Sequence, residues 1–119
     1  MKIEIEPGDV TIFRIKGKIL VGKGDELLKK AVKDFVADGG SKLILDLRKV
    51  HYVDNHGLQE IVRAHIRVMR EEGAEDSGLK LLNLNSRLRD LLSTKELLEE
   101  FSIFDDEKKA IASFEKKKL

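Results

Sequence analysis

A short apolar run in the middle of the chain constrains the fold more than any other feature of the sequence. The run consists of Leu43, Ile44, Leu45 and Leu47. A strand whose apolar side chains point in both directions is typical of a sheet that helices cover on both faces. We therefore expect this run to form the centre of an α/β sheet.

Helical periodicity appears on both sides of this run. On the N-terminal side one apolar stripe is formed by Leu27, Leu28, Ala31, Val32, Phe35 and Val36. We expect Asp25 to cap this helix and Gly39-Gly40 to end it. A second helix is expected from about Asn55 to Glu72, closed by Gly73. Its inner stripe is formed by Leu58, Ile61, Val62, His65 and Met69.

The rest of the chain continues the alternation of strands and helices. Residues 2–6 and 10–16 are expected to form a β-hairpin around the Pro7-Gly8 turn, and a polar turn is expected between Leu47 and the extended segment 51–53. After the second helix we expect a loop at 71–77, a strand at 79–84 and a short helix through Leu88 and Leu92. One more turn is expected to begin with a Ser93–Glu96 capping box. A strand at 101–104 and a helix at 106–114 complete the chain of elements.

This order, ββαβαβαβα, predicts a mixed, mostly parallel sheet opened by a hairpin and covered by helices. With 119 residues the chain has the length of one domain. We expect that domain to span residues 1–115, followed by a short basic tail at 116–119.

Composition excludes several classes of function. The formal net charge is +1, which gives no support to nucleic acid binding. Cysteine is absent, so disulfides and thiolate sites are excluded, and charged residues interrupt every apolar run before it reaches membrane-spanning length. We expect a cytoplasmic protein that does not insert into a membrane.

The segment from Asp46 to Leu58 is where a site is expected, because open α/β sheets bind ligands and partners at the carboxyl ends of their strands. Asp54 is placed to cap the second helix. Gly57 is a poor helix former in the first turn, which indicates close approach of a partner or of a neighbouring strand, and suggests a surface that is left open.

Catalytic and metal-binding interpretations of this segment are weaker. His51, Asp54 and His56 are acceptable metal ligands, but their spacing does not bring them to one point, so we expect no metal. His65 lies on the apolar stripe and is expected to be a hydrogen-bonded core histidine. The sequence contains no phosphate loop with its lysine, no Gly-x-Ser-x-Gly turn and no His-Glu-x-x-His helix, and Gly22-Lys23-Gly24 needs no ligand to serve as a turn. We expect neither enzymatic activity nor a cofactor.

A family resemblance rests on the same segment. The residues Leu43-Ile44-Leu45-Asp46-Leu47, Val50 and Val53-Asp54-Asn55-His56-Gly57-Leu58 resemble the STAS family of sulfate transporter and anti-sigma factor antagonist domains. In that family a strand ending Asp-Leu is followed by a valine and then by Asp-Ser-Ser-Gly-Leu or Asp-Ser-Ala-Gly-Leu at the start of a helix. The similarity extends over nearly the whole chain, from Gly17 to the closing segment 110–114.

The resemblance implies a partner-switching role in bacterial signalling and transcription regulation. Such domains bind an anti-sigma factor that is also a serine kinase, and phosphorylation of the serine after the aspartate breaks the complex. Here Asn55 stands at that serine and His56 at the next small residue, and Leu20 and Val21 stand where the family has an acidic position. Because asparagine has no hydroxyl, the protein is expected either to be permanently competent for binding or to serve a different partner.

We therefore predict an anti-sigma factor antagonist-like binding module whose partner is an anti-sigma factor or a serine-kinase-like protein. An accessory subunit of a membrane transport assembly is the alternative, and a small-ligand or nucleotide-binding domain is a third; homodimer formation is left open. The predicted partner-binding residues are Asp54, Asn55, His56, Gly57, Leu58, Gln59 and Arg63.

Overall fold

The computed structural model describes residues 1–69 and 77–115, which form a five-stranded sheet in the order β1-β2-β3-β4-β5. The strands are β1 (Lys2–Glu6), β2 (Thr11–Ile19), β3 (Lys42–Val53), β4 (Gly78–Leu82) and β5 (Ser102–Phe104). The helices are α1 (Gly24–Ala37), α2 (Asn55–Val68), α3 (Ser86–Thr94) and α4 (Glu107–Ala112), with a 3₁₀ turn η1 (Leu98–Glu100) before β5. The predicted α/β class and element order are confirmed.

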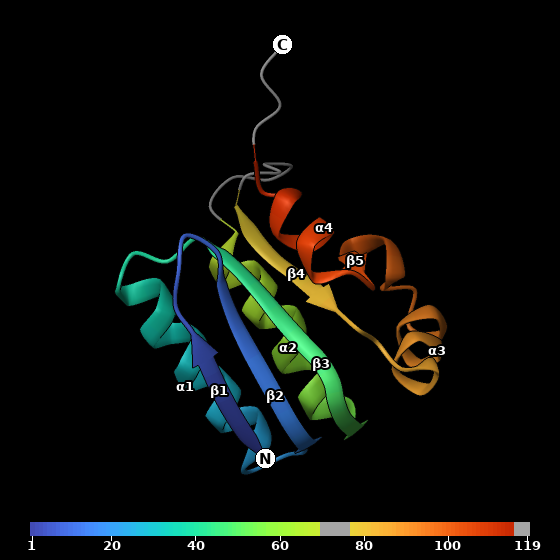
Figure 1. Cartoon of the computed structure of the whole chain (residues 1–119). Coiled ribbons are helices and arrows are strands. Elements are labelled where there is room, and N and C mark those ends of the chain that lie inside the picture. Colours follow the sequence, from blue (N-terminus) through green and yellow to red (C-terminus); the bar gives the residue numbers. More distant parts are fainter. Residues whose placement is uncertain (70–76, 116–119) are drawn as a thin grey trace.

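The sheet is mixed. β1 pairs with β2 antiparallel as the predicted hairpin, and the pairs β2–β3, β3–β4 and β4–β5 are all parallel. Helices α1 and α2 cover one face, α4 lies on the other face over β4, and α3 stands beside the end of β4 (Figure 1). The covered centre of the sheet is β3, as the apolar run predicts.

Two apolar clusters lie on opposite faces of the sheet. The larger cluster, on the α1 and α2 side, includes Phe13, Leu43, Leu45, Leu58 and Ile61. The smaller one, under α4, consists of Ile12, Ile44, Leu82, Ala110 and Phe114. The residues of the predicted apolar run are buried, and so are Leu58 and Ile61 of the α2 stripe, whereas Val62, His65 and Met69 are only partly buried. In the α1 stripe Leu28 and Val32 are buried, but Leu27 is 40% exposed and the other members are partly buried.

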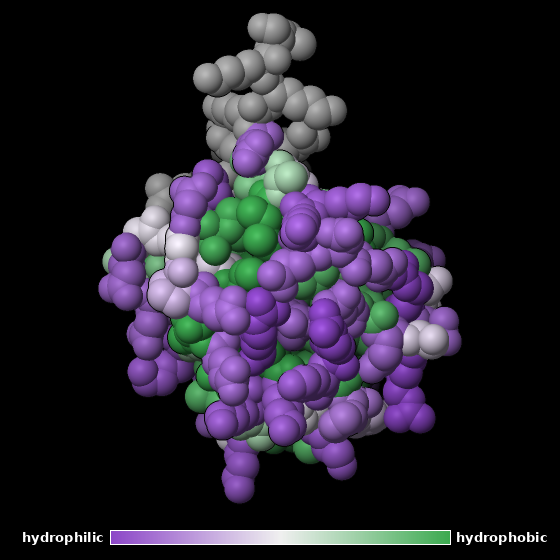
Figure 2. Space-filling view, in the orientation of Figure 1, coloured by the Kyte–Doolittle hydropathy of each residue, from purple (hydrophilic) through white to green (hydrophobic). Residues whose placement is uncertain are grey.

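The face that carries α4 also holds an ionic cluster around Arg14. The Arg14 guanidinium donates to Glu6 at 2.8 Å, to Asp46 at 2.9 Å and to Glu107 of α4 at 2.8 Å. These carboxylates raise the pKa of Arg14, and the hydrogen bond from Arg14 lowers the pKa of Glu6. Hydrophilic residues dominate the surface of this face, with hydrophobic residues visible between them (Figure 2).

β3 is longer than the sequence indicates. The predicted polar turn after Leu47 is wrong, because the strand continues without interruption to Val53. Its first half, from Lys42 to Asp46, pairs with β4 as well as β2, whereas Lys49 to Val53 continue beside β2 alone. Residues 48 and 49 are therefore exposed strand residues, whose polarity reflects solvent rather than a turn.

Several predicted helix boundaries are also wrong. Asp25 lies inside α1, where its carboxylate accepts from the backbone N–H groups of Gly22 and Glu26, both at 2.8 Å, instead of capping the helix. α2 ends at Val68 rather than Glu72, because Met69 adopts an extended backbone. The predicted stop at Gly73, most of the predicted 71–77 loop and the tail 116–119 lie outside the described residues.

The capping box at Ser93 and Glu96 is not formed. Ser93 lies within α3, which continues to Thr94, and Glu96 has a positive φ of 58° that breaks the helical path. β4 ends at Leu82 instead of residue 84, since Asn83 takes a left-handed φ of 62°. The last helix begins at Glu107, with the Asp106 carboxylate accepting from the Lys109 N–H at 3.1 Å.

Candidate functional site

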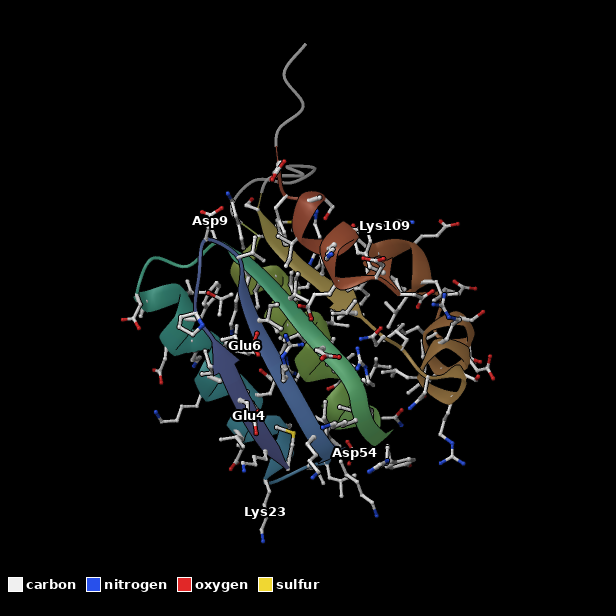
Figure 3. All side chains as sticks on the ribbon, in the orientation of Figure 1. Glu4, Glu6, Asp9, Lys23, Asp54 and Lys109 are labelled. Carbon is white, nitrogen blue, oxygen red and sulfur yellow. The ribbon has the colours of Figure 1, made fainter. Side chains whose placement is uncertain are left out.

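Asp54 fixes the junction between β3 and α2. As predicted, it is the N-cap of α2: its Oδ1 accepts from the Gly57 N–H at 2.7 Å. Its Oδ2 accepts from the Val21 N–H at 3.0 Å, and its own N–H donates to the Ile19 carbonyl at 3.2 Å. The hydrogen bonds from Gly57 and Val21 lower the pKa of Asp54. Asp54 therefore joins the loop after β2 to the start of α2, at the lower end of the sheet in Figure 3.

Gly57 lies against a neighbouring strand. A Cβ at this position would collide with the Ile19 carbonyl oxygen of β2 and lie 2.9 Å from the Ile19 Cγ2. The prediction of an open surface at Gly57 is therefore wrong, because the residue is buried. Leu58 is buried too, with 4% of its surface exposed. Both residues lie beneath the predicted binding surface and support it.

The other predicted site residues face solvent. Asn55, His56, Gln59 and Arg63 are all exposed. Arg63 Nη1 lies 3.6 Å from an oxygen of Glu60, whose side chain is only 4% exposed and also accepts from Arg67 Nη1 at 2.6 Å. The arginine side of α2 is thus tied to a buried carboxylate, which limits the positions that Arg63 can adopt.

Two grooves meet at Asn55. One, of about 370 Å³, runs between the end of β3 and α3, and its lining includes His51, Tyr52, Asn55, Arg87, Asp90, Leu91 and Thr94. The other, of about 470 Å³, is lined by Asn55, Leu58, Gln59, Val62, Arg63, Lys95 and Leu97. Asn55 contributes to both grooves, so its side chain stands where an occupant of either would contact it.

The contribution of α3 to this region was missed from the sequence. Asn85 follows the end of β4 and caps α3, accepting from the Leu88 N–H at 2.8 Å, while its Nδ2 donates to the Val50 carbonyl of β3 at 2.9 Å. Asn85 thereby holds α3 beside β3. Open α/β sheets bind ligands and partners at the carboxyl ends of their strands, so the end of β4 was a candidate as well as the end of β3. Asn85, which follows β4, could have been identified in this way.

Other polar residues of the predicted segment do not converge with Asp54. Asp46 points to the α4 face, where it meets Arg14, and accepts from Asn83 Nδ2 at 3.3 Å. His51 is exposed on the wall of the first groove. Across residues 1–69 and 77–115, no three His, Cys, Asp or Glu side chains gather as a metal-binding cluster.

His65 lies in the last turn of α2. Its ring lies 5.2 Å from the ring of Phe101, centroid to centroid, and burial lowers its pKa. Its Nδ1 has no hydrogen-bond partner among the described residues. A backbone hydrogen bond with Leu79 opposes this pKa shift, so the predicted hydrogen-bonded histidine is confirmed, although its ring is half-buried.

Comparison with known families decides the relationship that the motif suggests. The STAS domain family model matches residues 2–110. The chain belongs to the STAS domain family. The STAS match includes β3, the Asp54 loop and the whole of α2, so the site described above lies within the shared domain.

Solved structures show the same fold for this STAS domain. A candidate anti-sigma factor antagonist from Thermotoga maritima has a TM-score of 0.82 and 23% identity, over 94% of this chain and 93% of that one. An anti-sigma factor antagonist from Mycobacterium paratuberculosis has a TM-score of 0.80 and 19% identity, over 95% and 92%. A sulfate transporter family protein from Wolinella succinogenes has a TM-score of 0.70 and 24% identity, over 92% and 87%.

Two further findings complete the comparison. No curated protein gives a significant match. Among the described helices, none is long and apolar enough to cross a membrane.

Proposed function

We propose that this STAS domain is a regulatory binding module of the anti-sigma factor antagonist type, without catalytic activity. The family membership and the names of two structures with the same fold support this class. The observation that carries the proposal is the position of Asn55, exposed between two grooves at the end of the central strand. The partner is an anti-sigma factor or a serine-kinase-like protein, which a cytoplasmic location would make accessible.

The contacts are made by the exposed members of the predicted set, which are Asn55, His56, Gln59 and Arg63. Asp54, Gly57 and Leu58 act from beneath, because hydrogen bonds and burial hold them in place. A loop that is already ordered loses little conformational freedom on binding, so more of the contact energy appears as affinity. Arg87 of α3 and Lys95, the residue that follows α3, line these grooves and extend the surface.

In this proposal, Asn55 prevents regulation of binding by phosphorylation at this position. Phosphorylation of a serine in this place would put about −1.5 to −2 charges next to Asp54 and disrupt an interface. The segment from Asp54 to Leu58 contains no Ser, Thr or Tyr, so a serine kinase cannot use it. The domain is then constantly competent for binding, and any switch acts elsewhere.

A second candidate function is an accessory role in a membrane transport assembly. The sulfate transporter family protein from Wolinella succinogenes, which shares the fold, favours it. In that case the same surface would dock on a cytoplasmic transporter subunit. The identity of the bound protein separates the two functions.

Quantitative capture tests the proposal. The wild-type protein, Asn55→Asp and Lys108→Gln are immobilised and the bound proteins identified by mass spectrometry. Lys108→Gln is the matched control, since it makes the same one-unit change in net charge at an exposed position of α4. We expect a kinase-like ATPase to be retained by the wild-type protein and the control and depleted on Asn55→Asp. A transporter subunit in its place supports the second candidate, and equal retention by all three proteins removes the interface from Asn55.

A further inference from the structure

The first strand leaves one edge of the sheet open. β1 pairs with β2 along one side, and nothing in the described part of the chain pairs with its other side. An unpaired edge presents backbone N–H and C=O groups that can bond to another strand. Ile5 is 53% exposed and Met1 36% exposed at this edge, so apolar side chains accompany the free backbone groups.

The side chains of this edge are complementary to themselves. The sequence begins Met1-Lys2-Ile3-Glu4-Ile5. If two copies are laid antiparallel with Ile3 opposite Ile3, Lys2 of each copy faces Glu4 of the other, and Met1 faces Ile5. Directly opposed residues of antiparallel strands point to the same face of the sheet, where their side chains contact each other. In this register every such pair is either apolar or of opposite charge.

We propose that two copies of this chain associate through β1 in this register and form one continuous ten-stranded sheet. Charged side chains on an edge strand commonly deter association. Here Lys2 and Glu4 carry opposite charges, so in the Ile3-centred register they match their counterparts in a second copy. The partner is therefore this chain itself.

The surroundings of β1 favour the same register. Ile3 and Ile5 lie beside Ile15 and Phe13 of β2, on the face that α1 covers. A groove of about 610 Å³ opens there, with Ile5, Phe13, Ala31 and Phe35 in its lining. Pairing centred on Ile3 places Met1 of the second copy opposite Ile5, beside this groove, where a flexible thioether side chain is suited to fill an irregular apolar space.

A register centred on Glu4 is less favourable. It would oppose Glu4 to Glu4 on the two-fold axis and ask Lys2 to pair with Glu6 of the other copy. Glu6 already accepts two hydrogen bonds from Arg14, each of 2.8 Å. The Ile3-centred register leaves that ion pair intact and puts no like charges opposite each other.

The dimer would leave both candidate binding surfaces free. The Asn55 surface, formed by Asn55, His56, Gln59 and Arg63, follows the end of β3. That end of β3 lies at the same end of the sheet as the start of β1 (Figure 1). Because the two β1 strands run antiparallel, the two Asn55 surfaces would lie at opposite ends of the joined sheet. The dimer is thus independent of the proposed partner function, and either can fail without the other.

Charge reversal on β1 tests the proposal by sedimentation velocity over a range of protein concentrations. The wild-type chain, of 13.5 kDa, is expected to approach twice that mass as its concentration rises. Lys2→Glu and Glu4→Lys each oppose like charges twice across the axis, so each is expected to weaken association by about tenfold or more. The double variant Lys2→Glu/Glu4→Lys restores both pairs and is expected to restore the dimer.

A charge-reversal control on α4 and a folding check accompany these variants. Lys108→Glu makes the same charge change on α4 as Lys2→Glu makes on β1, and is expected to leave association unchanged. Circular dichroism confirms that each variant is folded, since the altered side chains are exposed. A wild-type chain that stays monomeric at every concentration overturns the proposal. So does a dimer that ignores both single reversals, and failure of the double variant to recover overturns the Ile3-centred register.

Discussion

Six consecutive residues, from Asp54 to Gln59, divide into two interleaved groups. Asp54, Gly57 and Leu58 are tied to the body of the domain by hydrogen bonds, close packing and burial, whereas Asn55, His56 and Gln59 face solvent. A helix start at the end of a central strand can thus hold its backbone rigidly while leaving neighbouring side chains free to recognise a partner. Substitutions in the first group should change stability, and those in the second should change binding.

The largest loss of stability is expected from Leu58→Ala. Leu58 is buried in the main apolar cluster, so its truncation removes buried surface and leaves a cavity. We expect a loss of about 2–5 kcal/mol in the free energy of unfolding. Gln59→Ala, one residue further along the helix, is the control and should stay within about 0.5 kcal/mol of the wild-type protein. Chemical denaturation measures both, and equal losses would contradict the division.

Gly57→Ala is expected to have the next largest effect. Alanine is the better helix former by about 1 kcal/mol, so an open position would gain stability from this change. Its Cβ would instead collide with the backbone of Ile19, and we expect a net loss of about 1–3 kcal/mol. A thermal melt that shows stabilisation would mean that β2 does not approach α2 as described.

Asp54→Ala should cost less, about 0.5–2 kcal/mol, by removing the helix cap. Asp54→Asn keeps a capping oxygen and should cost less than the alanine variant. The N–H groups that donate to Asp54 lower the pKa of its carboxyl in the folded protein. The charged carboxylate therefore stabilises the fold at pH values above its ordinary pKa of about 4. This stabilisation is lost as the pH falls through the lowered pKa of the folded state. Denaturation across this acidic range should show the wild-type and Asp54→Asn stabilities converging. A difference in unfolding free energy that does not change with pH would contradict a stabilising contribution from the Asp54 charge.

The sequence was sufficient for the parts of the fold that depend on local pattern. The apolar run at residues 43–47 and the stripe of α2 predicted the buried centre, and Asp54 was predicted as a cap because capping is decided within one helical turn. Gly57 was correctly identified as a position of close approach. Its neighbour, Ile19, lies far away in the sequence, so local pattern left a partner and a strand as equal alternatives.

Features that depend on long-range pairing were missed. The exposed residues Arg48 and Lys49 have the composition of a turn, and only their place beside β2 keeps them in a strand. The hydrogen bond from Asn85 to the Val50 carbonyl places α3, and it joins the N-cap of α3 to a strand 35 residues earlier in the chain. The grooves on either side of Asn55 follow from that placement, so the sequence could not reveal them.

The smallest change in stability is expected from Asn55→Asp, and this variant probes the proposed binding surface itself. An acidic residue is tolerated in the first turn of a helix, so the free energy of unfolding should stay within about 0.5 kcal/mol of the wild-type value. Isothermal titration calorimetry with the captured partner should show affinity weakened by about tenfold or more, because the new charge stands beside Asp54 in the interface. Unchanged affinity in this folded variant would contradict the claim that the Asn55 surface binds the partner.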